Sequence, residues 1–395
     1  MFEVLFPAMT DFLRRSIRFG YAFAGYLFAF ASLAFTVHGT ANAQNFGQAP
    51  IRVMFINPAP PEDLYWNLVS DVMRAAANDL GVELEVLNAF HSAEYTLEYA
   101  TRAAQRGPAD RPNYIIFRNV QRVAQRVFEV TNAAGINTIT IDAPLERAEL
   151  EVLGGPRQAI PTWLGQVVPN AAAASEQMIG LLAQTVENTG FRGIIQVVAM
   201  TGPEDDIGSQ FRLSGLTQGL ANIGNAQLLH AFPAGWSTRV ADREAYKAFR
   251  YAADAPIWWV ADDNMTLGVL NVLRNTHRIV GQDTFVGAFH WTEPMMTAVL
   301  QNQVQYVAGG QFIQGAAALI LAHDHYRGRD FTDVGLNHTM DLAFIYRDNL
   351  ANVGRIMISG LWEQIDFRRF SRATNPALQT YDFTINSYLR AAIGQ

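Results

Sequence analysis

The sequence contains no cysteine, and it has little charge beyond a modest acidic excess. The absence of cysteine excludes disulfides, a thiol nucleophile, a cysteine-based metal site and a lipid-bearing N-terminal cysteine. Lys247 is the only lysine, and no run of basic residues or basic-aromatic patch accompanies the arginines. With a formal net charge of −7, the chain is a poor nucleic-acid binder, so we expect no nucleic acid among its partners.

The motifs of the common catalytic sites are also missing. There is no G-x-S-x-G elbow, no G-x-x-x-x-G-K-[ST] phosphate loop and no H-E-x-x-H, and no G-x-G-x-x-G follows the first expected strand. His323-Asp324-His325 looks like metal chemistry, but side chains two residues apart on a helix point in different directions. We therefore expect no metal, no cofactor and no enzymatic activity.

The first 43 residues have the layout of a signal peptide. Arg14, Arg15 and Arg18 precede an uncharged stretch at 19–37, and Ala41-Asn42-Ala43 supplies the small residues of a cleavage site. The stretch is also long enough for an N-terminal membrane anchor, which is the alternative. With cleavage after Ala43, we expect a soluble exported protein that the outer membrane of a Gram-negative cell retains in the periplasm.

Strand and helix patterns alternate along the rest of the chain. An apolar run at 51–56 indicates a buried strand, and Trp66, Val69 and Met73 recur at helical spacing before Gly81. Alternation without hairpin signals implies parallel sheets with helices on both faces, an α/β doubly wound fold. Further strands are predicted at 82–87, 114–117, 138–141, 193–199, 227–232, 257–260 and 284–289, helices at 93–106, 121–134, 171–187, 210–223, 240–251 and 265–274, and a shorter helix, strand and helix at 293–326.

The alternation is interrupted once, at Gly154-Gly155-Pro156, and the second half then repeats the scheme of the first. We expect two doubly wound parallel-sheet lobes joined by hinge crossings, with Gly154-Gly155 and Gly309-Gly310 as hinge candidates. The carboxyl ends of both sheets would open onto a cleft between the lobes. The expected N-terminal lobe contains 44–155 and 311–337, and the expected C-terminal lobe contains 156–310 and 338–395.

Aromatic and short polar side chains follow the expected strand ends. Flat rings can cover the apolar faces of a sugar, while carboxylates and amides bond its hydroxyls, so the set predicts a site for a small hydroxylated ligand. Any one of these residues is equally well explained by core packing or helix capping, and their collective placement favours the ligand site. The candidates are Asn57, Tyr65, Trp66, Asp142, Gln210, Trp236, Asp262, His290, Trp291 and Gln311.

Several short motifs give the chain a family resemblance. They are Tyr65-Trp66, Thr140-Ile141-Asp142, Arg212-Leu213-Ser214-Gly215-Leu216, the segment from Ala261 to Gly268, and Val286-Gly287-Ala288-Phe289-His290. With these motifs, the expected mature chain resembles the type I periplasmic binding proteins of the ribose-binding and sugar ABC transporter class. The resemblance implies ligand contacts from Tyr65, Trp66, Asp142, Gln210, Trp236, Asp262 and His290.

Four positions depart from the pattern of ribose binders. Ala143 and Gln210 stand where arginines are expected, Asp262 replaces an asparagine, and His290 lies near the usual aspartate. Segments 309–316 and 362–370 are similar to a subgroup near the autoinducer-2 receptor, whose members can serve membrane sensor kinases.

Three functions fit the resemblance. We expect a monomer that captures a sugar-like ligand for an ABC permease. One alternative is a ligand-sensing co-receptor for a membrane sensor kinase or cyclase, and a more distant one is an exported α/β hydrolase or isomerase.

Overall fold

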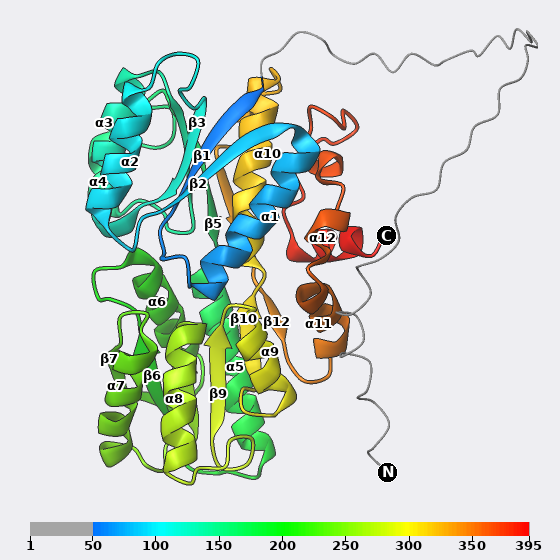
Figure 1. Cartoon of the computed structure of the whole chain (residues 1–395). Helices are drawn as coiled ribbons and strands as arrows, with labels where there is room; N and C mark the ends of the chain where they lie inside the picture. Colours follow the sequence, from blue (N-terminus) through cyan, green and yellow to red (C-terminus); the bar gives the residue numbers. More distant parts are fainter. Residues whose placement is uncertain (1–49, 395) are drawn as a thin grey trace, which may run out of the picture. The chain divides into compact units, whose positions relative to one another are not determined.

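Two β-sheets, one in each of two lobes, organise the chain (Figure 1). The structure is a computed structural model that describes residues 50–394, so the expected signal peptide at 1–43 lies outside the described residues. The first sheet contains β1 (Ile51–Asn57), β2 (Val82–Asn88), β3 (Tyr114–Arg118), β4 (Asn137–Ile141), β5 (Trp163–Pro169) and β11 (Asn337–Met340). Its strands lie in the order β11-β5-β4-β3-β1-β2.

The second sheet has the same design. It contains β6 (Ile195–Thr201), β7 (Ala226–Pro233), β8 (Ile257–Val260), β9 (Phe285–Phe289), β10 (Tyr306–Gly309) and β12 (Ala343–Ile345), in the order β12-β10-β9-β8-β6-β7. Strand pairing in both sheets is parallel except between β10 and β12. The predicted α/β fold with two doubly wound, mainly parallel sheets is confirmed.

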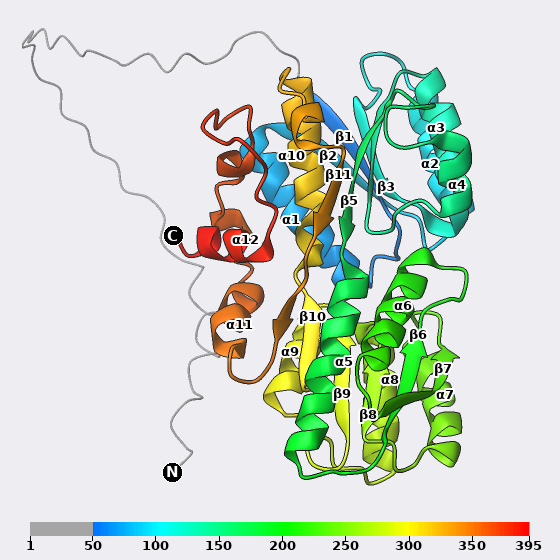
Figure 2. The ribbon, with the colours of Figure 1, turned by 180° about the vertical axis from the view of Figure 1, so that it is seen from behind.

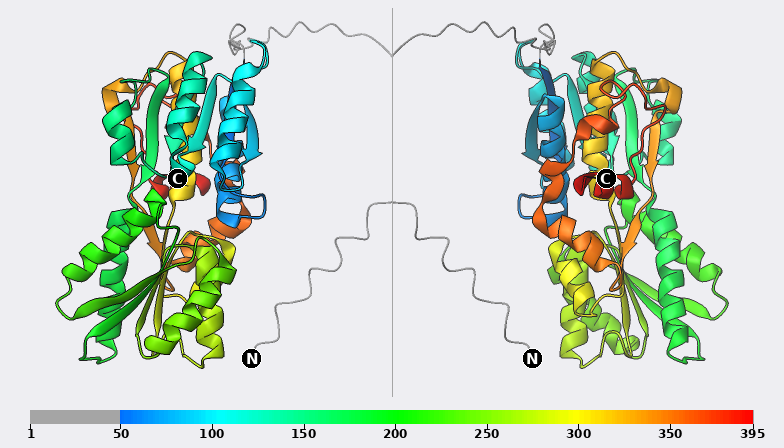
Figure 3. Two further views of the ribbon diagram at one scale, coloured as in Figure 1. Left: turned by 90° about the vertical axis from the view of Figure 1, so that its left-hand side faces the viewer. Right: turned by 90° about the vertical axis from the view of Figure 1, so that its right-hand side faces the viewer.

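Helices cover both faces of each sheet (Figures 1, 2 and 3). Among the described residues, no helix combines the length and apolar character needed to cross a membrane. The first lobe has α1 (Leu64–Leu80), α2 (Ala93–Gln105), α3 (Ala124–Ala133), α4 (Arg147–Leu153) and α10 (Gln314–Tyr326). The second has α5 (Ala171–Asn188), α6 (Ile207–Ala221), α7 (Thr238–Tyr251), α8 (Asp263–Asn275) and α9 (Glu293–Leu300).

Strand β1 shows why the sheets are buried on both sides. Val53 and Phe55 pack into the core formed with α1 and α10, whereas Met54 and Ile56 pack into the core formed with α2 and α3. These four side chains are at most 1% exposed. A strand covered on both faces reads as a continuous apolar run, which is the pattern that the sequence has at 51–56.

The first crossing between the lobes differs from the expected boundary at 155/156. Strand β5 pairs with β4 and β11 in the first sheet, so the chain leaves this lobe after Pro169, immediately before α5. Gly154 ends α4 in a left-handed conformation with φ of 68°, and its N–H bonds the carbonyl of Leu150. The Gly-Pro segment is therefore a helix end and loop within the first lobe.

The other two crossings enclose α10 and β11. The chain returns to the first lobe between β10 and α10, where Gly310 has φ of 96°. It leaves again between β11 and β12, so 338–340, expected in the second lobe, belong to the first sheet. Gly154-Gly155 lies at none of the crossings, so its hinge role is not supported by the sheet order, and whether Gly309-Gly310 acts as a hinge stays a prediction.

The C-terminal segment from 346 onward, here called the tail, contacts both lobes (Figure 2). Its helix α11 (Leu350–Ser359) packs against α9, while two short 3-10 helices, Leu361–Gln364 and Phe367–Phe370, pack against α1. The expectation that the whole tail belongs to the second lobe is therefore wrong.

The tail also covers the crossing between β10 and α10. Trp362 packs edge-on against Phe312 with ring centroids 5.1 Å apart. Ile385, the first residue of α12 (Ile385–Ala392), lies close to Gly310. A Cβ added to Gly310 would be only 2.8 Å from the Cβ of Ile385. Glycine is therefore needed at this crossing both for its positive φ and for this contact.

Asp324 on α10 anchors the tail to the first lobe. This side chain is fully buried, and it accepts hydrogen bonds from the Ser371 hydroxyl, the Arg372 backbone N–H at 2.6 Å and the Tyr381 hydroxyl at 3.0 Å. His323 Nδ1 lies 3.0 Å from the same carboxylate, and His325 Nδ1 lies 2.8 Å from the Tyr114 hydroxyl. The His323-Asp324-His325 motif thus holds the fold together through separate contacts.

We expect Asp324→Ala to lower the free energy of unfolding by about 3 kcal/mol or more, because it leaves several buried donors without an acceptor. Urea denaturation measures the change. Asp71→Ala is the matched control, since the Asp71–Arg74 pair is exposed and its loss should cost less than about 1 kcal/mol. Equal effects of the two substitutions would contradict the anchoring role.

His338 on β11 is enclosed by aromatic rings. Its ring centroid lies 5.9 Å from that of Phe331, 5.7 Å from that of Tyr381 and 5.7 Å from that of Phe383. Burial, partly offset by a backbone hydrogen bond at Gly335, lowers the pKa of His338 to about 4. The unfolded chain therefore takes up a proton below pH ~6.5, which the folded protein takes up only near pH 4.

This difference in pKa makes a contribution to the free energy of unfolding that is fully present above pH ~6.5 and is lost as the pH falls toward 4. In His338→Phe that loss should be smaller by roughly 2 kcal/mol between pH 7 and pH 4.5, because the titrating group is gone. Urea unfolding of both proteins at the two pH values tests the difference. Parallel losses in the two proteins would count against this source of acid sensitivity.

Candidate ligand-binding site

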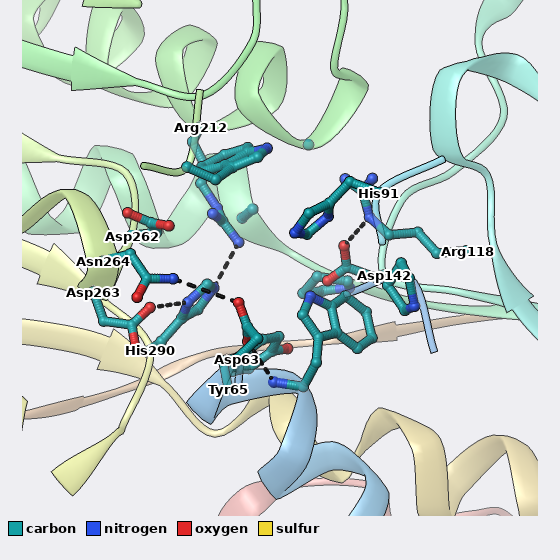
Figure 4. A pocket seen from close by; sticks show the side chains of 16 residues that line it. Asp63, Tyr65, His91, Arg118, Asp142, Arg212, Asp262, Asp263, Asn264 and His290 are labelled. Carbon is teal, nitrogen blue, oxygen red and sulfur yellow. Dashed lines mark hydrogen bonds and ion pairs between the residues drawn. The ribbon is translucent and has the colours of Figure 1, made fainter. Parts of the chain in front are cut away.

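A pocket lies between the two lobes at the carboxyl ends of their strands (Figure 4). It is lined by Pro58, Asp63, Tyr65, Trp66, His91, Arg118, Asp142, Pro169, Ala171, Gly208, Arg212, Trp236, Asp262, Asp263, Asn264 and His290. The empty space between these side chains, with the solvent at the mouth included, is about 620 Å³. Parallel strands direct their following loops to one edge, so this position follows from the sheet topology.

The structure brings together six of the side chains proposed from the sequence. Tyr65 and Trp66 come from the first turn of α1, while Asp142, Trp236, Asp262 and His290 follow the ends of β4, β7, β8 and β9. Helix α1 is placed by the Asp63 side chain, which accepts the Trp66 N–H at 2.9 Å and caps the helix start. That these six residues bind a ligand stays a prediction.

Asn57 and Gln210 do not line the pocket. The Asn57 side chain is buried, and it donates to the Trp66 carbonyl at 3.2 Å and the Ser70 hydroxyl at 3.0 Å, bracing the start of α1. Gln210 lies on the exposed side of α6, where its amide donates to the Glu204 carbonyl at 2.8 Å. Both side chains form hydrogen bonds within their own lobe, and neither is among the lining residues.

Trp291 and Gln311 also lie outside the pocket, in the core beside the crossing. The Trp291 indole donates to the Val307 carbonyl at 3.0 Å, and its ring packs onto Gly309. Gln311 is 1% exposed in the short helix after Gly310, and neither polar atom of its side chain has a partner within 50–394. Their backbone positions follow strand ends, but their side chains turn inward.

Several pocket residues were missed in the sequence. Arg118 is the last residue of β3, so the strand-end rule could have found it. Asp63 precedes the proposed aromatic pair, and Arg212, Asp263 and Asn264 lie within motifs that carry the family resemblance. His91 follows β2 in a loop with no recognisable motif.

Arg118 joins the two lobes through carboxylates on both sides. Its Nε donates to Asp142 of the first lobe at 2.6 Å, and its Nη2 donates to Asp206 of the second lobe at 2.8 Å. Its side chain is only 10% exposed. Burial lowers the pKa of Arg118, but the two carboxylates outweigh it and raise the pKa above its usual value.

A second set of contacts runs through His290. The Tyr65 ring stacks on the His290 ring across the lobes, with centroids 3.9 Å apart and planes at 11°. His290 Nε2 lies 3.2 Å from Arg212 Nη2, and Nδ1 lies 2.9 Å from an Asp263 oxygen (Figure 4). Because a guanidinium can only donate, Nε2 accepts from Arg212, and Nδ1 donates to the Asp263 carboxylate.

The pocket carboxylates differ in their electrostatic environments. Burial raises the pKa of Asp142, but Arg118 and Arg212 outweigh it, so the pKa lies below its usual value. Burial raises the pKa of Asp262, and the adjacent Asp263 adds to this effect. Burial also raises the pKa of Asp63.

The backbone around the pocket is strained. Asp142, Trp236, His290 and His91 have φ of 70°, 61°, 74° and 56°, in the left-handed region that non-glycine residues rarely adopt. Gly202 allows Trp236 to lie against the backbone, since a Cβ there would be 2.1 Å from the indole. Such strain concentrates at functional sites, where the surrounding structure maintains it.

Comparison with known proteins agrees with this geometry. The family model described as the periplasmic binding protein domain matches residues 53–330. The chain belongs to this family of periplasmic binding proteins. The family is named for binding in the periplasm and not for catalysis, and the tail lies beyond the matched residues.

Solved structures share the fold of this periplasmic binding protein. A periplasmic sugar-binding protein from Pseudomonas fluorescens aligns with a TM-score of 0.77 and 24% identity, covering 86% of this chain and 99% of its own. An ABC transporter periplasmic solute binding protein from Actinobacillus succinogenes, with bound D-allose, aligns with a TM-score of 0.65 and 16% identity over 77% of this chain and 100% of its own.

A third similar structure is an ABC transporter solute binding protein from Bacillus halodurans with bound myo-inositol. It has a TM-score of 0.64 and 16% identity, and covers 78% of this chain and 98% of its own. No curated protein sequence matches the chain.

The bridge through Arg118 predicts how this periplasmic binding protein opens. Asp206→Asn should retain the cap on α6, where Oδ1 accepts the Ser209 N–H at 2.9 Å, but remove the charge that holds Arg118. A charge-assisted bond contributes about 1.5–3 kcal/mol, so the ratio of open to closed protein should rise about tenfold or more. Small-angle X-ray scattering without added ligand should show a larger radius of gyration.

Asp205→Asn is the control for this experiment. Asp205 is the exposed neighbour of Asp206, and no hydrogen bond of its side chain is present among the described residues. Its substitution changes the same formal charge and should leave the scattering profile unchanged. An unchanged radius in Asp206→Asn would show that the bridge does not hold the lobes together.

Proposed function

We propose that this periplasmic binding protein captures a small hydroxylated solute between its lobes and delivers it to an ABC permease. The observation that carries the proposal is the convergence of polar groups from both lobes on one pocket, with Arg118 bonded to Asp142 on one side and Asp206 on the other. A solute that contacts both lobes stabilises the arrangement in which they face each other, and so shifts the population toward it.

The pocket offers the two kinds of surface that a sugar or polyol needs. Trp66 and Trp236 supply flat apolar faces, from the first and second lobe. The carboxylates of Asp142 and Asp262 can accept hydrogen bonds from hydroxyls, and Arg212 can donate to ring or hydroxyl oxygens. Similar structures with bound D-allose and myo-inositol support this ligand class.

The chemistry of the pocket favours binding over catalysis. The hydrogen bonds of His290 go to Arg212 and Asp263, and no serine or threonine nucleophile faces it among the residues that line the pocket. We propose that the protein works as a monomer, since both sides of the pocket come from one chain. Export through the segment at 1–43 would place the protein in the periplasm. A permease can there recognise the surface that the two lobes form when they are closed.

We expect at least one member of a panel of monosaccharides, polyols and their amino derivatives to raise the melting temperature of the exported protein by a few °C at saturation. A ligand that binds only the folded state stabilises it by mass action, about 2.7 kcal/mol at a hundredfold excess over Kd. Trp236→Ala should abolish the shift caused by that compound, because it removes one face of the pocket.

Gln210→Ala is the control variant, since Gln210 lies outside the pocket and should not affect the shift. Stabilisation by apolar metabolites alone, or a shift that survives Trp236→Ala but not Gln210→Ala, would rule out this assignment of the site.

A further inference from the structure

Carboxylates outnumber cations at the interlobe pocket. Asp63, Asp142, Asp262 and Asp263 line it, and Asp206 joins it through Arg118. Arg118 and Arg212 are the guanidiniums among the lining residues. His290 lies between these two kinds of group, since its Nε2 accepts from Arg212 and its Nδ1 donates to Asp263.

The arginines are already engaged with specific partners. Arg118 is shared between Asp142 and Asp206, and Arg212 donates to the Ala261 carbonyl at 2.7 Å and to His290. The Arg212 guanidinium also lies over the Trp236 ring, 5.5 Å from its centroid. Among the described residues, Asp63 and Asp262 form no ion pair with an arginine or lysine, although Arg212 attracts Asp262 from a greater distance.

Asp262 has an unused acceptor directed into the pocket. Its side chain is buried, with the residue 3% exposed, and Oδ1 accepts the Met265 N–H at 2.7 Å. The second oxygen has no hydrogen-bond partner within the described residues, although the residue lines the pocket. A buried carboxylate with a free oxygen is costly unless another group bonds it.

Asp63 faces Asp262 and Asp263 from the other lobe (Figure 4). One of its oxygens caps α1, and the other is bonded only weakly, by the Asn264 amide at 3.4 Å. Asp63 and Asp262 are thus N-cap residues of helices in opposite lobes, each with an acceptor left over. A third N-cap residue, Asp206, bonds the Arg118 guanidinium, which shows that a cation suits such a position.

Bringing these groups together is electrostatically unfavourable. Burial raises the pKa of both Asp63 and Asp262, and Asp263 raises both further. A neutral hydroxyl can accept or donate a hydrogen bond here but cannot offset the excess negative charge. A positive charge placed between the two aspartates offsets it directly.

We propose that the captured solute carries a protonated amine in addition to its hydroxyls, and that this amine binds between Asp262 of the second lobe and Asp63 of the first. Amino sugars and amino polyols have this chemistry. Trp66 and Trp236 line the same pocket, and indole faces attract an ammonium group. This inference rests on the proposed function, because it names the class of solute that the same pocket takes.

Isothermal titration with matched pairs tests the charge. The probes are D-glucosamine against D-glucose, D-galactosamine against D-galactose, and 1-amino-1-deoxysorbitol against sorbitol, with each N-acetylated amine as a second, bulkier neutral control. In at least one pair, the amine should bind about tenfold or more tightly than both neutral compounds, as expected for a hydrogen bond to a charged group.

Asp262→Asn tests the proposed partner of the amine. Asparagine also caps helices, so α8 should keep its start, while the negative charge is removed. The preference for the amine over its hydroxyl parent should disappear in this variant and persist in Asp205→Asn, whose substitution removes an exposed carboxylate outside the pocket. Circular dichroism checks that both variants are folded.

The outcomes separate this inference from the proposed function. Tighter binding of the neutral members, or an amine preference that survives Asp262→Asn, overturns the amine site and leaves the capture of a hydroxylated solute standing. Binding by none of the sugars, polyols and amines overturns both.

Discussion

The position of the two lobes depends on Arg118. One guanidinium reaches carboxylates on both sides of the cleft, Asp142 in the first lobe and Asp206 in the second. A buried ion pair adds little net stability, because desolvation offsets much of its attraction, but its geometry fixes how the two surfaces meet. The stack of Tyr65 on His290 and the bond between Asn264 and Asp63 require the same approach of the lobes.

Most of the fold could be predicted because its signals are local. The apolar strand β1 and the helix α1 that follows, with its cap and its apolar residues at helical spacing, can be predicted from their own residues. Strand β5 was missed because it contains Gly165 and ends at Pro169, which are typical of a linker. Glycine is needed at position 165 because a Cβ there would lie 2.7 Å from the carbonyl oxygen of Leu336. Leu336 is far along the chain, so this contact could not be predicted from the residues around Gly165.

Residues of the candidate site could be predicted where they follow a strand end and their side chains face the cleft, as with Asp142, Trp236 and His290. The same rule failed for Asn57 and Trp291, because it predicts where a backbone lies and not which way the side chain turns. Asp206 follows β6 but was not among the candidates, since its role depends on an arginine of the other lobe. Contacts between lobes have no local signature in the sequence.

The sheet order of the first lobe has a consequence for how the chain becomes folded. Its edge strand β11 and its covering helix α10 come after every strand of the second sheet except β12, and the tail that packs on α1 comes later still. When a chain is delivered from its N-terminus, by a ribosome or a translocon, five of the six strands of the second sheet can pair before the first sheet is complete. The strands that emerge earliest must wait with an open sheet edge for the last sixth of the chain. The first sheet is therefore complete only when nearly the whole chain has emerged.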